Sequence, residues 1–262
     1  MAVPGQGVSV SATDWGGTRE PGVVLLPGFG ATQRSLAAVT ARLGGRRVVT
    51  ADLRGHGRST SGPWSFPAAV EDLAAVVDAF DLEAPVVGGH SLGGMVALHY
   101  AISGRAAAGV VNIDGWGPGV ASRFPGLDPV VVQAHLAQVA TGELASRPAR
   151  FLVERTRQGR EGMTRQLMTD LHGADVVAWH EAAPCRSLAF NAVAAERGAV
   201  RLLMGARVSR LQRAHREGLR RDLAALAERR PDVTFVEVDA THRLVTTEPD
   251  RVASAIREWL PA

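Results

Sequence analysis

The chain has 262 residues, of which 46% are hydrophobic and 21% charged, a balance typical of one large globular domain. The formal net charge of +3 is too small to indicate a nucleic-acid partner, and no apolar run approaches the length of a membrane-spanning helix. All 29 basic residues are arginine, which excludes chemistry through a lysine Schiff base.

Cysteine usage and the first residues bear on the compartment. The single cysteine, Cys185, cannot form an internal disulfide, and residues 1–18 lack the apolar segment of a signal peptide. We therefore expect a cytoplasmic protein with a small-molecule substrate and no nucleic-acid or membrane partner. No metal-binding spacing and no phosphate-binding or dinucleotide-binding glycine motif occurs, so we expect no cofactor and no metal.

Apolar runs alternate with helix-compatible segments over the first 114 residues. Strands are predicted at residues 8–12, 23–26, 48–51, 85–88 and 109–113. Helices are predicted between them at residues 36–43, 67–80 and 92–102. Such alternation predicts an α/β fold with a doubly wound, mostly parallel sheet.

The alternation stops after Asp114. No clear buried strand is seen in residues 115–198, where helical patterns cover residues 129–140, 149–156, 162–171 and 174–183. It resumes with a predicted strand at 200–204, a helix at 210–229, a strand at 233–238 and a helix at 249–260. We therefore predict an α/β core from residues 1–114 and 199–262. Residues 115–198 are predicted to form an inserted helical cap over the strand ends, where open α/β sheets bind ligands.

The most informative stretch is VVGGHSLGG, residues 86–94, in which an apolar run ends in glycines around Ser91 and a helix-compatible run follows. Gly89, Ser91 and Gly93 match Gly-x-Ser-x-Gly, which between a strand and a helix lifts the serine hydroxyl clear of the sheet. The alternative is a glycine-rich turn whose serine only caps the helix. The strand before the turn and the helix after it favour a nucleophile.

Four segments carry a resemblance to a known family. They are LLPGFG (residues 25–30), DLRGHGRS (52–59), GHSLGG (89–94) and DATH (239–242) followed by Glu248-Pro249. In their order and spacing the chain resembles the α/β-hydrolase superfamily, over nearly its whole length outside the cap. The resemblance implies a Ser–acid–His triad and an oxyanion hole of two backbone amides.

Ser91 needs a base, because a free hydroxyl is hardly ionised at neutral pH. His242 is the candidate, since it follows the last predicted strand and would return to the sheet edge that carries the serine. The family places the two oxyanion-hole amides at Leu92, after the nucleophile, and at Phe29, in the loop after strand 23–26. That loop departs from the commoner family form at Pro27, where histidine often stands.

The acid is the member of the triad at which the chain departs from the family pattern. The family predicts Asp in a Gly-x-x-Asp arrangement that begins at Gly205, after the predicted strand 200–204, but Val208 occupies that slot. The other family placement is the end of the strand that precedes the cap, which here is Asp114. A site without an acid, or one that uses Asp239, remains open.

Several further residues are candidates for binding. Trp64, Trp116, Phe124 and Trp179 could line an apolar pocket under the cap, with His90 as a pocket wall, although aromatic side chains are more often core. The arginines of residues 201–230 are read as a solvated helix face, with a docking face for an acidic carrier protein bearing an acyl group as the alternative.

These observations predict a cofactor-free serine hydrolase that cleaves an ester, lactone or thioester through an acyl-Ser91 intermediate, with His242 as base and Asp114 as acid. Aspartate is the nucleophile in the epoxide and haloalkane branches, which Ser91 disfavours. One alternative is a lyase, cyclase or cofactor-free oxygenase, in which His242 is the base and Ser91 only holds the substrate. A non-catalytic ligand receptor is a third.

Overall fold

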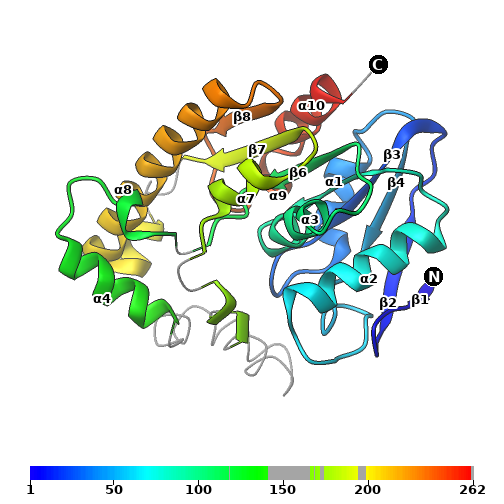
Figure 1. Cartoon of the computed structure of the whole chain (residues 1–262), viewed down its shortest axis with the longest axis horizontal. Coiled ribbons are helices and arrows are strands. Elements are labelled where there is room, and N and C mark those ends of the chain that lie inside the picture. The colour runs from blue at the N-terminus through cyan, green and yellow to red at the C-terminus, as the bar shows by residue number, and fades with distance from the viewer. Residues whose placement is uncertain (118, 141–165, 168, 172–173, 194–198, 261–262) are drawn as a thin grey trace.

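The protein is built around one sheet with helices on both faces (Figure 1). The structure is a computed structural model, which describes residues 1–117, 119–140, 166–167, 169–171, 174–193 and 199–260. The order of the eight strands in the sheet is β1-β2-β4-β3-β5-β6-β7-β8. β1 and β2 pair in antiparallel fashion, and β2 also runs antiparallel to β4, whereas neighbours from β4 to β8 are parallel. The predicted doubly wound, mostly parallel α/β sheet is confirmed.

The strands in chain order are β1 (Ala2–Pro4), β2 (Ser9–Asp14), β3 (Arg19–Leu26), β4 (Arg46–Ala51), β5 (Val86–His90), β6 (Gly109–Ile113), β7 (Ser187–Ala192) and β8 (Val233–Val238). The helices are η1 (Gln33–Leu36), α1 (Ala37–Thr40), α2 (Phe66–Ala79), α3 (Leu92–Ile102), η2 (Ala121–Arg123), α4 (Pro129–Ala140), α7 (Val176–Ala182), α8 (Ala199–Arg229), α9 (Leu244–Thr247) and α10 (Pro249–Trp259), with η marking 3-10 helices.

The core lies on both faces of the sheet. The helices α2, α3 and α7 lie on one face of the sheet, and α1, α9 and α10 lie on the other (Figure 1). The buried apolar side chains of each set belong to apolar clusters on its own face. On the first face α8 covers β7, where Leu219 and Leu223 join Ala189 in one apolar cluster. Because both faces are covered, β5 and β6 are buried along their whole length.

β5 and β6 fix the position of the chemistry-bearing turns. They are parallel neighbours, with Gly89 opposite Asn112 and His90 opposite Ile113. Both strands therefore end at the same edge of the sheet, and the next residues in the chain are Ser91 and Asp114. The amide of Ser91 donates to the carbonyl of Ile113 at 2.9 Å, which ties the two turns together.

Two strands of the sheet were not predicted, β1 at its edge and β7 within it. β7 lies between β6 and β8 and falls inside residues 115–198, so the assignment of that whole range to an inserted cap is wrong at its C-terminal end. Its apolar run is broken by Ser187 and Asn191, which are fully buried. They are tolerated there because Ser187 bonds to His180 and Asn191 accepts from Arg216.

The predicted strand at residues 200–204 is also wrong, because those residues belong to α8. A short apolar run fits a helix as well as a strand, and periodicity alone cannot separate the two. In the predicted cap, α4 and α7 are helical, whereas residues 149–156 and half of 162–171 lie outside the described residues. The cap therefore stays a prediction. None of the helices described has the length and apolar character that crossing a bilayer requires.

Candidate active site

Ser91 sits on a strained turn between β5 and α3. Its backbone has φ 53° and ψ −119°, a region that side-chain-bearing residues rarely adopt. Such a conformation costs about 1–3 kcal/mol and persists only where the surrounding structure enforces it. A serine in this position holds its hydroxyl above the sheet edge, which is the geometry of a nucleophile elbow.

Close backbone packing enforces this turn. A Cβ atom added to Gly93 would lie 2.3 Å from the carbonyl oxygen of Leu26 and 2.7 Å from that of Pro27. A Cβ at Gly28 would lie 3.1 Å from the Cβ of Ser91. The serine turn and the loop after β3 are therefore pressed together, with Gly28, the residue before Phe29, against the serine.

We expect Gly93→Ala to destabilise the fold by roughly 2 kcal/mol or more, because the new methyl meets backbone atoms that cannot move aside. The same displacement should lower the activity of the folded fraction. Gly117→Ala is the matched control, since its Cβ would only reach ordinary contact with Leu171 at 3.5 Å. Urea unfolding of both variants measures the difference; equal midpoints would contradict the packing argument.

Three predicted site residues lie in one hydrogen-bonded row. Nε2 of His242 is 3.0 Å from Oγ of Ser91, and Nδ1 of His242 is 2.6 Å from Oδ2 of Asp114. An ionised carboxylate only accepts, so Nδ1 carries the proton and Nε2 is the acceptor for the serine hydroxyl. The His242 side chain is 50% exposed and the Asp114 side chain is fully buried.

Asp114 follows β6 with a positive φ of 57° and is held from several sides. Its Oδ1 accepts from the amide of Ala192 at 3.0 Å and from Arg216. Burial raises the pKa of Asp114, but the charge of Arg216 and the hydrogen bond from His242 outweigh burial and lower it to about 2. The carboxylate is therefore ionised at neutral pH.

The turn that presents Asp114 is held by Asn112. Its Oδ1 accepts from the amide of Gly115 at 2.8 Å, and its Nδ2 donates to the carbonyl of Gly115 at 3.1 Å. Both bonds are buried, so the side chain replaces solvent for two backbone groups of a strained turn.

The prediction that Val208 occupies the usual position of the acid is wrong. It assumed a strand before Val208, but Val208 lies within α8 and not in a loop after a strand. The strand that should precede that slot is β7, and residues 194–198 beyond it lie outside the described residues. Asp114, the alternative acid, is the carboxylate that meets the histidine.

His90 has a structural contact that the sequence did not indicate. Its Nε2 is 2.6 Å from the carbonyl oxygen of His242, so the ring donates to the backbone of the histidine loop. Burial, then repulsion from His242, lowers the pKa of His90 to about 4, which keeps its ring neutral at pH 7. His90 thus anchors His242, a contact more specific than the predicted pocket wall.

The amides of Phe29 and Leu92 lie at the two turns that meet at Ser91. Leu92 is the first residue of α3, where the N–H has no partner within the helix. Within the described ranges, neither amide donates a hydrogen bond. Their predicted role as the two oxyanion-hole donors stays a prediction.

Comparison with known proteins decides the family. The sequence model of the alpha/beta hydrolase family matches residues 23–255. The chain belongs to the alpha/beta hydrolase family.

Individual relatives are more distant. Protein phosphatase methylesterase 1 of Bos taurus is 38% identical over 96 residues, which are 33% of this chain and 25% of that protein, so the chain matches a small part of this relative. A thermophilic esterase from Thermogutta terrifontis superposes with a TM-score of 0.66 at 22% identity, over 99% of this chain and 97% of the esterase. AqDC, solved with the product of its ring cleavage of the Pseudomonas quinolone signal, gives a TM-score of 0.67 at 19% identity over 99% and 98%. At these identities the structures establish the fold alone.

The predicted pocket aromatics of this alpha/beta hydrolase pack into its apolar clusters. Trp64 and Trp179 both contact Phe66, at ring separations of 5.9 and 5.8 Å, in the core beside α3. Trp116 donates to the carbonyl of Phe190, and Phe124 packs between α4 and α8. Their role in substrate binding stays a prediction.

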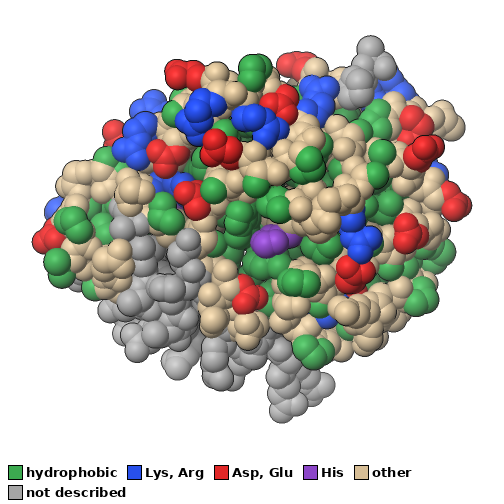
Figure 2. All heavy atoms as spheres, in the orientation of Figure 1, with side chains coloured by type: hydrophobic (Ala, Val, Ile, Leu, Met, Phe, Trp, Pro, Cys, Tyr) green, Lys and Arg blue, Asp and Glu red, His purple; other side chains and the backbone are tan. Residues whose placement is uncertain are grey.

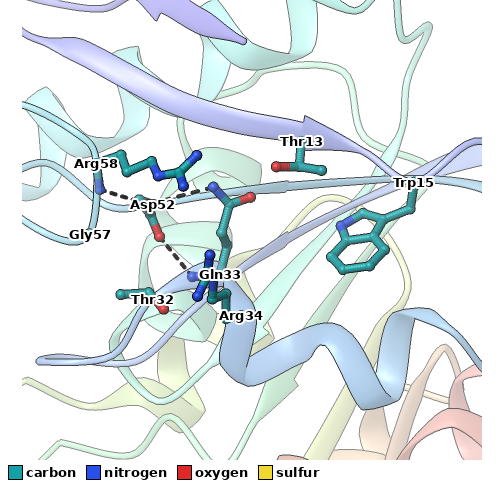
Figure 3. Close-up of a pocket in the computed structure, with 8 residues that line it drawn as sticks. All are labelled: Thr13, Trp15, Thr32, Gln33, Arg34, Asp52, Gly57 and Arg58. Atoms are coloured by element: carbon teal, nitrogen blue, oxygen red, sulfur yellow. Dashed lines mark hydrogen bonds between the residues drawn. The ribbon is translucent and has the colours of Figure 1, made fainter.

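A cavity of about 490 Å³ lies elsewhere in the fold. Figure 3 shows Gln33 at its centre, with Arg34 and Arg58 on the side of Asp52 and Trp15 on the other. Thr13, Thr32 and Gly57 complete its lining, which includes no member of the Ser91–His242–Asp114 row. Among the described residues, no three His, Cys, Asp or Glu side chains gather to hold a metal ion.

Arginine side chains on the surface of α8 lie among carboxylate side chains (Figure 2). Arg221 pairs with Asp222 at 2.8 Å, and Arg229 pairs with Glu181 at 3.2 Å. Opposite charges interleaved in this way favour the predicted solvated face, and the docking of a carrier protein stays a prediction.

The fold should lose stability below pH 6.5 because of His180. This fully buried ring accepts from Asn112 at Nε2 and bonds to Ser187 at Nδ1, and burial lowers its pKa to about 3. The unfolded ring takes up a proton near pH 6.5, so stability is lost from there down towards pH 3, by about 2 kcal/mol at pH 5.

Urea midpoints at pH 7.5 and pH 5 measure this loss. His180→Gln should show a smaller difference between the two pH values than the unmodified protein, even if it is less stable at both. An unchanged difference would remove His180 as the cause.

Proposed function

We propose that this protein is a serine hydrolase that cleaves a small ester, lactone or thioester through an acyl-Ser91 intermediate. The observation that carries the proposal is the row Ser91–His242–Asp114, with contacts of 3.0 and 2.6 Å, on a strained strand-to-helix turn. These are the geometric relations by which a nucleophile, its base and an orienting acid are recognised.

In the first half-reaction the Ser91 hydroxyl attacks the acyl carbon while Nε2 of His242 takes its proton. Asp114 holds the imidazole in the required tautomer and stabilises the imidazolium that forms. The amides of Phe29 and Leu92 would donate to the oxyanion of the tetrahedral intermediate. His242 then gives its proton to the leaving oxygen or sulfur atom, which leaves Ser91 acylated.

In the second half-reaction water attacks the acyl-serine, with His242 again as base. The proton then returns to Ser91 Oγ as the acid product leaves. No lysine or metal is required by this sequence of steps. The names of the matched methylesterase and esterase support an ester as the substrate.

The alternative is a non-hydrolytic reaction in which His242 takes a proton from the substrate and Ser91 only binds it. The similarity in fold to the ring-cleaving AqDC supports this reading. The apparent lack of an acid had favoured it as well, and the contact between Asp114 and His242 removes that reason.

Labelling with a fluorophosphonate separates the two proposals. A hydrolase should gain the mass of one phosphonyl group at Ser91, as read by intact mass spectrometry and peptide mapping. The alkyl phosphonate of the same size, without the fluoride leaving group, is the control and should leave the mass unchanged. Lack of labelling, where a control esterase reacts, would favour the non-hydrolytic alternative.

A further inference from the structure

Arg216, in α8, contacts the same buried acid as His242. Its Nη1 donates to Oδ1 of Asp114 and its Nη2 to Oδ2 at 3.1 Å, so the guanidinium binds the carboxylate with both arms. Oδ2 is also the atom that accepts from His242. The arginine and the histidine therefore compete for one carboxylate.

The surroundings hold Arg216 in this orientation. Nη1 also donates to Oδ1 of Asn191 at 2.8 Å, which fixes the amide so that its oxygen faces the arginine. Nδ2 of Asn191 is then buried with no partner among the described residues. An unsatisfied buried donor is tolerated where another requirement outweighs it, and the requirement here is an acceptor for Arg216.

We propose that Arg216 is a positioning residue that acts through Asp114 to keep His242 a neutral base at lower pH than an unshared carboxylate would allow. The effect on catalysis rests on the proposed function, whereas the ion pair between Arg216 and Asp114 does not depend on the substrate. Its physical basis is the sharing of one negative charge between two cations once His242 is protonated.

The sign follows from the charges that face the ring. Asp114 stabilises the imidazolium, whereas Arg216, on the same carboxylate, opposes it. His90, the other titratable ring beside His242 at 4.7 Å between centroids, is neutral at pH 7 because burial lowers its pKa to about 4. Ser91 carries no charge. Removal of the Arg216 charge leaves the Asp114 carboxylate unshared, so the imidazolium form of His242 should become more stable.

Histidine Cε1–H resonances of the unmodified protein, followed by NMR from pH 4 to 9, test the proposal directly. The His242 signal is assigned as the one lost in His242→Gln. In Arg216→Gln the midpoint of this signal should move up by roughly one pH unit. Arg216→Lys keeps the charge and should stay within roughly half a unit of the unmodified protein.

The matched control is Arg220→Gln, which removes the same charge from an exposed position one turn further along α8. Its His242 midpoint should not move. The pH at which fluorophosphonate inactivation reaches half its maximal rate should follow the NMR midpoint in each variant.

A midpoint that stays within about 0.3 units in Arg216→Gln, or that falls, would overturn the proposal. If Arg216→Gln does not fold, a midpoint in Arg216→Lys more than about one unit above the unmodified value would overturn it equally. The proposed function fails separately: an unlabelled Ser91 in the unmodified protein would reject the hydrolase while the NMR shift still reports on Arg216.

Discussion

Ser91→Ala is expected to lower the turnover of a simple ester such as p-nitrophenyl acetate by roughly 10⁴- to 10⁶-fold, because no acyl-enzyme can form without the hydroxyl. Fluorophosphonate labelling should vanish in the same variant. The substitution deletes one oxygen atom at the tip of the turn, and within the described part of the chain that hydroxyl hydrogen-bonds to His242 alone. Urea unfolding should therefore differ little from that of the unmodified protein.

Ser103→Ala is the matched control, because it removes a serine hydroxyl from the other end of α3, where the hydroxyl donates to the carbonyl of Tyr100. That variant should keep its turnover and its labelling. If Ser91→Ala retained more than about a hundredth of the activity, Ser91 would be a binding residue and not the nucleophile.

The second large effect is expected for Asp114→Asn, which should lower kcat by roughly 10³- to 10⁴-fold with little change in KM. Asparagine has one acceptor, and Arg216 donates to both carboxylate oxygens of Asp114. When that acceptor faces Arg216, the amide N–H₂ faces Nδ1 of His242. The imidazole must then carry its proton on Nε2, where it cannot take the proton of Ser91.

Asp239, which directly follows β8, is the second candidate for the acid. Asp239→Asn should retain most of the turnover. Steady-state kinetics of both variants on one ester substrate make the comparison. Full activity in Asp114→Asn, together with loss of activity in Asp239→Asn, would show that Asp239 and not Asp114 is the acid. An equal rise of KM in both would instead point to damage to the binding site.

The sequence allowed most of the sheet to be predicted, because β3, β4, β5 and β6 are apolar runs bounded by glycine, proline or charged residues. β7 was missed because hydropathy treats Ser187 and Asn191 as breaks. Their suitability for a buried strand depends on His180 and Arg216, which are distant partners that no local pattern reveals.

The site likewise contains residues that the sequence predicted and residues that it did not. Ser91, His242 and Asp114 could be placed because each follows a strand whose end lies at one edge of the sheet. The position of Arg216 could not be predicted, since it depends on how α8 lies across β7. The sequence of an arginine-rich helix does not show which of its arginines binds a buried carboxylate. The contact of His90 was hidden because its partner is a backbone carbonyl, which every residue has.

The anchoring of His242 has a consequence for heat inactivation. Ser91 and Asp114 follow adjacent, fully buried strands, whereas residues 241–243 are all exposed. The backbone of His242 is held to the core by His90. Local opening of an exposed segment with few buried contacts needs less free energy than global unfolding. On warming, the histidine loop should therefore come away from the serine while the sheet is intact, and catalysis should be lost reversibly several degrees below the melting of the fold.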